Sequence, residues 1–122
     1  MPALLLYGFS QGEAVQLRTL LGFLQDVRVV EVPPAGYGVT IGDLLAGKTP
    51  PALAVGKPFA RKLLVIDDAP GQMLNLLLSA AGQVTKGQSI LRAVVTETNR
   101  TWSGSYLYEH LLEEEALLSG QA

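Results

Sequence analysis

Two adjacent carboxylates are the residues of this chain with the clearest capacity for chemistry. Asp67 and Asp68 follow the apolar run LLVI, where a buried strand is expected to give way to a helix. Acids at the carboxyl end of a central strand often bind magnesium or phosphate-bearing ligands. An aspartate at a strand-to-helix junction is also an ordinary helix N-cap. We expect a cap, and keep a metal-assisted enzyme that uses Asp67 and Asp68 as the alternative hypothesis.

The single histidine suggests a second, weaker metal site. His110 and Glu114 are spaced i, i+4 in an expected helix, a spacing that can hold a metal ion. Two ligands on one helix do not make a site, and a solvated helix face is the simpler interpretation. The chain has no cysteine, which excludes disulfides, thiolate nucleophiles and cysteine-built metal centres. We therefore assign no catalytic residue, no metal ligand and no cofactor.

Short polar side chains between a strand and a helix form the other candidate site. Thr96, Thr98, Asn99 and Thr101 precede Trp102, the only tryptophan. Such side chains hydrogen-bond to nearby backbone and favour turns and helix starts, so the first interpretation is a well-capped turn. The second is a polar surface that contacts a small ligand or a protein. The contact residues of that surface would be Thr96, Thr98, Asn99, Trp102, Asp67 and Asp68.

The same stretch resembles a known family. AVVTETNRTW, followed by a helix that contains EHLLEEE, is similar to the C-terminal motif of the small bacterial family known as domain of unknown function 3783, in which Thr96, Asn99 and Trp102 match. LLLYGFS with the helix after it, and a strand ending at EVPP, resemble the first half of that family. Gly104 and Ser105 depart from its pattern, which has a leucine and a stronger helix former there. The resemblance implies no activity.

Length and composition limit the classes of protein to which the chain can belong. The 122 residues suit one domain, 1–122, and 48% hydrophobic with 16% charged residues are typical of a globular protein. A net charge of -2 gives no general attraction to nucleic acid or anionic lipid. The apolar N-terminal run is too short for a signal peptide or a membrane span. We expect a cytoplasmic protein that binds neither nucleic acid nor membrane.

An internal repeat predicts the fold that positions both candidate sites. Shifting the chain by 59 positions aligns 3–32 with 62–97, and each copy reads as an apolar strand, a helix and a strand with polar interruptions. The order β-α-β-β-α-β fits a ferredoxin-like α+β two-layer sandwich, with the first and third strands central. The helix 103–118 is then an addition, and 33–61 is an irregular insert.

The helices carry recognisable start signals and apolar faces. Ser10 and Glu13 have capping-box spacing, Thr40 and Asp43 repeat it before a short helix, and Ser103 is expected to cap the last helix. The helix 69–81 is apolar around more than one face, so we expect it to be buried on two sides. The expected stripe of the first helix is Val15, Leu17, Leu20, Leu21 and Leu24.

The insert ends in a basic segment, 47–62, which contains no acid. Its cations are Lys48, Lys57, Arg61 and Lys62. We expect a mobile solvated loop there, with an anion-facing loop as the alternative.

More apolar surface is predicted than the elements cover. Both central strands are apolar on two faces, while only the C-terminal helix is spare. A symmetric homodimer would cover the remainder. The alternative is that the proline-rich segment 49–59, with Leu53, Val55 and Phe59, folds back as a lid. The sequence favours a non-enzymatic domain that binds a small ligand or a protein through the turn from Thr96 to Trp102.

Overall fold

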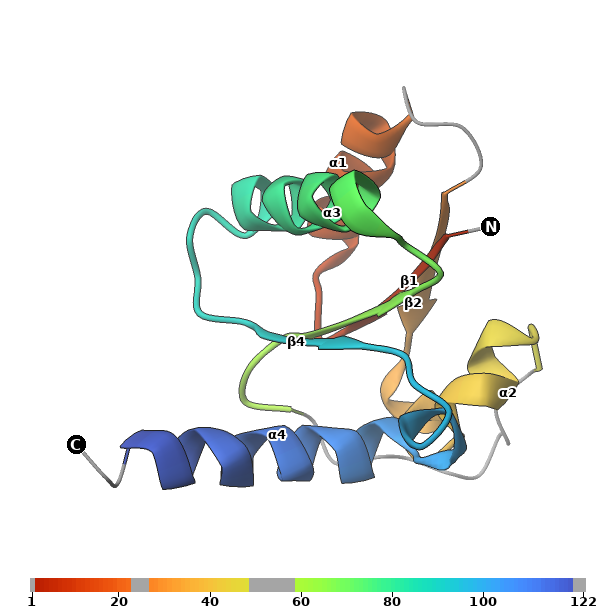
Figure 1. Cartoon of the computed structure of the whole chain (residues 1–122). Helices are drawn as coiled ribbons and strands as arrows, with labels where there is room; N and C mark the ends of the chain where they lie inside the picture. Colours follow the sequence, from red (N-terminus) through yellow and green to blue (C-terminus); the bar gives the residue numbers. More distant parts are fainter. Residues whose placement is uncertain (1, 23–26, 49–58, 120–122) are drawn as a thin grey trace.

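The computed structural model has helices on both sides of one four-stranded sheet (Figure 1). It describes residues 2–22, 27–48 and 59–119. The elements in chain order are β1 (Ala3–Tyr7), α1 (Gln11–Leu21), β2 (Arg28–Val32), η1 (Pro34–Gly36), α2 (Ile41–Leu45), β3 (Leu63–Asp67), α3 (Gly71–Val84), β4 (Leu91–Val94), η2 (Asn99–Thr101) and α4 (Gly104–Ser119). This mixture confirms the predicted α+β class. None of the helices in these ranges is long and apolar enough to cross a membrane.

The sheet joins two βαβ units through their first strands. Its order is β2-β1-β3-β4, with β1 parallel to β2, β3 parallel to β4, and β1 antiparallel to β3. The predicted division into central β1 and β3 and edge β2 and β4 is therefore confirmed. The ferredoxin-like order is not confirmed, because each unit keeps its two strands side by side instead of splitting them around a third strand.

One face of the sheet packs against α1 and α3 through aliphatic side chains. Alternate residues of the central strands, Leu4, Leu6, Leu64 and Ile66, point to this side and are buried. Their buried partners on the two helices are Ala14, Leu17, Leu21, Leu77, Ala80, Ala81 and Val84.

The apolar faces of these two helices are narrower than predicted. On α1 the buried residues are Ala14, Leu17 and Leu21, whereas Val15 and Leu20 are 53% and 41% exposed. Leu24 lies outside the described residues. On α3 the expected burial on two sides is not met within one copy of the chain, since Leu76 is 51% exposed. Among the described residues each helix packs on the sheet and on the other helix, which leave its outward apolar side chains uncovered.

The other face of the sheet is covered by α2 and α4, which makes a third layer (Figure 1). Leu5, Tyr7 and Val65 of the central strands are buried against these helices. The C-terminal helix thus covers the face that the two crossover helices leave open. The buried residues contributed by α2 and α4 are Ile41, Leu44, Leu45, Leu107 and Tyr108.

Three of the four predicted helix starts, at Ser10, Thr40 and Ser103, are confirmed. The Ser10 and Glu13 side chains each accept a hydrogen bond from the other residue's backbone N–H, at 3.1 and 2.8 Å. Thr40 Oγ1 accepts from the Asp43 N–H at 3.2 Å, and Ser103 Oγ accepts from the Tyr106 N–H at 3.1 Å. These signals were readable because donor and acceptor are three residues apart.

The described ends of the basic segment are fixed by partners elsewhere in the chain. Lys48 Nζ lies 3.4 Å from Asp43, Arg61 lies 2.8 Å from Glu115, and Lys62 Nζ lies 3.5 Å from Glu13. Phe59 stacks on Tyr108, with 4.0 Å between ring centroids. Lys57 and the other predicted lid residues, Leu53 and Val55, lie outside the described residues.

Candidate functional site

The turn after β4 is closed by its own side chains. Asn99 Oδ1 accepts from the Thr96 N–H at 2.8 Å, and Thr96 Oγ1 accepts from the Asn99 N–H at 3.1 Å. Asn99 Nδ2 donates to the Val94 carbonyl at 3.0 Å, and the residue is buried. Thr101 Oγ1 donates to the Thr98 carbonyl at 2.8 Å. The polar groups that suggested a ligand site are therefore largely used inside the turn.

Backbone contacts with the insert hold this turn in place. The Ile41 N–H donates to the Trp102 carbonyl at 2.9 Å, and the Ser105 N–H donates to the Tyr37 carbonyl at 3.0 Å. Gly42 lies against Arg100, so closely that a Cβ there would stand 2.9 Å from Arg100 Cγ. The start of α2 and the turn thus form one packed unit.

Asp67, at the end of β3, contacts this packed unit through an ion pair with Arg100. Its Oδ1 lies 3.3 Å from a guanidinium nitrogen of Arg100, because β3 and β4 are parallel and their carboxyl ends meet. The predicted N-cap by Asp67 or Asp68 is wrong. The helix α3 begins at Gly71 behind Pro70, with no side-chain cap, after Asp68 has taken a left-handed φ of 57°. Aspartate tolerates that conformation better than most residues.

An exposed row of rings continues from the turn along α4, and we call Trp102, Tyr106 and His110 the aromatic strip. The Trp102 ring meets Tyr106 and His110 edge-on, with centroids 4.7 and 5.0 Å apart. Trp102 is half-buried against the α2/α4 core, whereas Tyr106 is 56% exposed. Sequence reasoning missed Tyr106 and Arg100 as site residues, although the i, i+4 spacing of positions 102, 106 and 110 was available as a signal.

Acidic side chains surround the aromatic strip. Glu109 and Glu113 are exposed on α4 within one turn of His110, and Glu114 lies 3.1 Å from His110 Nε2. Exposed Glu97 lies within the turn itself. The surface around the strip is consequently anionic, with Arg100 as the nearby cation.

The structure does not gather a metal-ligand set in the part of the chain that it describes. No group of three or more His, Asp or Glu side chains is placed to hold an ion there. His110 and Glu114 form an exposed pair, and Asp67 is already bound by Arg100.

Beneath the site lies a buried tyrosine that leaves no room for a side chain at position 104. Tyr7 is fully buried, and among the described residues its hydroxyl has no hydrogen-bond partner. A Cβ at Gly104 would overlap the Tyr7 ring and lie 2.9 Å from its hydroxyl. Gly104 therefore leaves room for the ring at the start of α4. Burial raises the pKa of Tyr7 well above its usual value.

These features define a small mixed α+β domain with a closed turn between β4 and α4. Residues 62–118, from the start of β3 to near the end of α4, match the model of the family described as a domain of unknown function (DUF3783). The match supports the family suspected from the C-terminal motif, and the resemblance of the first half of the chain lies outside the matched residues. The chain matches no curated protein and no solved structure.

Proposed function

We propose that this chain is a non-enzymatic protein-binding domain whose contact surface is the aromatic strip together with Arg100. The observation that carries the proposal is Tyr106, a 56% exposed ring held edge-on against Trp102 beside a hydrogen-bonded turn. Tyr, Trp and Arg dominate the binding energy of protein interfaces. A ring already held by packing loses little conformational entropy when a partner arrives.

The partner is a protein segment that carries basic residues. Glu97, Glu109 and Glu113 are exposed around the strip, so they attract lysine or arginine side chains at the rim of an interface. Attraction between exposed charges is screened by salt, and the affinity falls as ionic strength rises.

A protein suits this surface better than a small polar ligand. Asn99 is buried and donates or accepts three hydrogen bonds within the turn, and Thr96 shares two of them. A small ligand that used these groups would have to break the turn. Thr98 and Trp102 remain proposed contact residues, at the edge of the binding surface.

The competing proposal is a metal-assisted enzyme using Asp67 and Asp68. Their place at the carboxyl end of a central strand favours it, but a metal at Asp67 would displace Arg100, which now lies 3.3 Å from that carboxylate. Thermal-shift screening with divalent ions separates the two proposals. A metal-dependent rise in Tm that both Asp67→Ala and Asp68→Ala abolish would support the enzyme.

The binding proposal is tested with a matched pair of baits. The intact chain, Tyr106→Ala and Leu118→Ala are each used to capture proteins from a lysate of the source organism. Leu118 is 76% exposed near the end of α4 and lies outside the aromatic strip, so it controls for a lost surface side chain.

We expect a basic protein that the intact chain and Leu118→Ala retain and Tyr106→Ala loses. Its affinity for the purified chain should fall by about tenfold in Tyr106→Ala, the effect of a hot-spot side chain. Equal retention by Tyr106→Ala would contradict the proposal.

A further inference from the structure

The helix α3 is a surface helix without charge. Its 14 residues include no Asp, Glu, Lys or Arg. Its outward side chains are neutral amides, a serine and a half-exposed leucine: Gln72, Asn75, Leu76, Ser79 and Gln83. Surface helices ordinarily carry charged residues on their wet face, and depletion of charge is the compositional mark of the centre of an interface.

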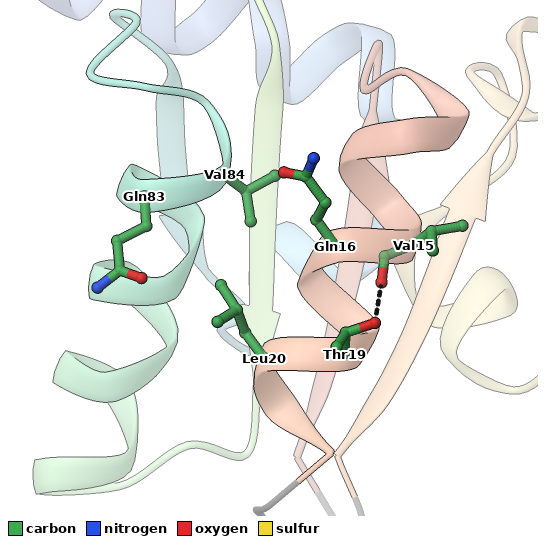
Figure 2. Close-up of a pocket in the computed structure, with 6 residues that line it drawn as sticks. All are labelled: Val15, Gln16, Thr19, Leu20, Gln83 and Val84. Carbon is green, nitrogen blue, oxygen red and sulfur yellow. Dashed lines mark hydrogen bonds between the residues drawn. The ribbon is translucent and has the colours of Figure 1, made fainter.

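A groove between α3 and α1 continues this neutral surface (Figure 2). It has a volume of about 370 Å³. Leu20 and Val84 point into the groove in Figure 2, and Val15 lies on the far side of α1. The complete lining is Val15, Gln16, Thr19, Leu20, Gln83 and Val84.

The charges of α1 are directed away from the groove. Arg18 lies 3.0 Å from Glu31 and also donates to the Val29 carbonyl, both on β2. Glu13 is held at the start of the helix by Ser10 and Lys62. The lining is uncharged, and two of its apolar residues, Val15 and Leu20, are 53% and 41% exposed.

We infer that the α1/α3 face, defined as the outward side chains of α3 and the lining of the groove, binds a second copy of this chain. In a twofold-symmetric dimer each patch meets its own copy, so a charged side chain near the axis meets its like and is unfavourable. Gln16 and Gln83 can each donate and accept hydrogen bonds, and therefore pair with themselves, whereas the Thr19 hydroxyl already donates to the Val15 carbonyl and can only accept. The face is electrically self-complementary, which distinguishes it from the acidic surface around the aromatic strip.

The neutral composition of the α1/α3 face fits a second copy of the chain. A basic or acidic partner would find no opposite charge on the face. A copy of the chain buries Leu20, Leu76 and Val15 without leaving a charge unpaired. The outward apolar side chains of two adjacent helices are then explained by one contact.

Light scattering and analytical ultracentrifugation from low micromolar to millimolar concentration test this inference. We expect the intact chain to reach a mass near twice 13.0 kDa as the concentration rises. Leu76→Glu should raise the dimer dissociation constant by about 100-fold, because the new carboxylate would be buried without a partner. Leu76 is half-exposed in the monomer, so the variant should fold, which circular dichroism checks.

The matched control is Leu118→Glu at the far end of α4. Leu118 is 76% exposed, more than Leu76, so non-specific apolar association would respond to it more strongly. We expect its dissociation constant to be unchanged. A monomer at every concentration, loss of the dimer in Leu118→Glu, or a dimer that Leu76→Glu leaves intact would each overturn the inference.

Opposite charges placed on two copies of the chain test whether the partner at the α1/α3 face is a second copy. Gln83→Lys and Gln83→Glu should each weaken association alone, whereas an equal mixture of the two should restore a dimer. Failure of the mixture to associate better than either variant would overturn the assignment of a second copy to this face.

Discussion

The two helical layers cover the same sheet with different chemistry. The α1/α3 layer packs aliphatic side chains such as Leu17 and Leu77 against the sheet, and its helix α3 presents an uncharged outer surface. The α2/α4 layer packs rings, with Tyr7, Tyr37 and Tyr108 around Phe59, and presents acids and rings to solvent. The crossover helices of the βαβ units form the first layer, whereas the insert and the C-terminal helix form the second.

The difference shows that the packing of a helical layer on the sheet does not determine the chemistry of its outer surface. Both layers bury alternate residues of the same central strands, so the sheet alone would allow them to be alike. The outer surfaces nevertheless differ, since α4 exposes acids and rings and α3 exposes no charged residue. The following substitutions compare the layers directly.

The largest expected contrast comes from one substitution made in both layers. Gly104→Ala should lower the free energy of unfolding by about 3 kcal/mol, because the methyl group overlaps the buried Tyr7 ring. Gly82→Ala in α3 should raise it by up to about 1 kcal/mol, since nothing lies within 4 Å of the added Cβ and alanine favours helix. Urea denaturation of the three proteins measures both effects, and a loss in both variants would remove the contrast.

Removal of a helix or turn cap is the next contrast. Asn99→Ala should cost about 2 kcal/mol, because it removes the two hydrogen bonds that the buried Asn99 side chain makes with Thr96 and Val94. Ser10→Ala, at the exposed capping box of α1, should cost about 1 kcal/mol. Thermal and urea unfolding provide the measurement. Equal losses would mean that burial adds nothing to the turn.

Alkaline pH should act through the α2/α4 layer, where Tyr7 is buried. Burial raises the pKa of Tyr7 above the 10.0 of an exposed tyrosine, so above pH 10 the unfolded chain releases a proton that the folded chain retains. Stability is therefore present below pH 10 and is lost as the pH rises, by about 1.4 kcal/mol per pH unit for each such group. Burial also raises the pKa of Tyr37, although its backbone hydrogen bond with Gly8 opposes this.

Tyr7→Phe tests the origin of this pH dependence. The urea midpoint of the variant should fall less steeply between pH 9 and 11, roughly, with the remaining fall due to Tyr37. At neutral pH the variant should gain about 1 kcal/mol, because the buried hydroxyl that it removes has no hydrogen-bond partner in the described structure. An unchanged alkaline fall would place the titrating group elsewhere.

The smallest effects should come from the exposed ion pairs, one in each layer. Glu31→Gln breaks the pair with Arg18, and Asp67→Asn weakens the pair with Arg100. Each should cost about 0.5 kcal/mol or less, and less still in high salt, because these side chains are partly exposed. Urea denaturation at two salt concentrations checks this. A cost near 2 kcal/mol, roughly, for Asp67→Asn would mean that the turn depends on its ion pair.

The sequence by itself determined the features that depend on neighbouring residues. The caps at Ser10, Thr40 and Ser103 and the closed turn around Asn99 were readable because each donor and acceptor lie three residues apart. Continuous apolar strands likewise identified β1 and β3 as central, since burial on two faces requires apolar side chains at every position.

The tertiary structure alone decided which of these segments meet. It placed Arg100 beside Asp67, 33 residues away, so the predicted cap became one half of an ion pair. It kept the two strands of each βαβ unit adjacent, and it turned Val15, Leu20 and Leu76 outward. Helical periodicity predicts an apolar face, but which apolar residues are covered depends on the elements that pack there, and those are brought together by contacts distant in sequence.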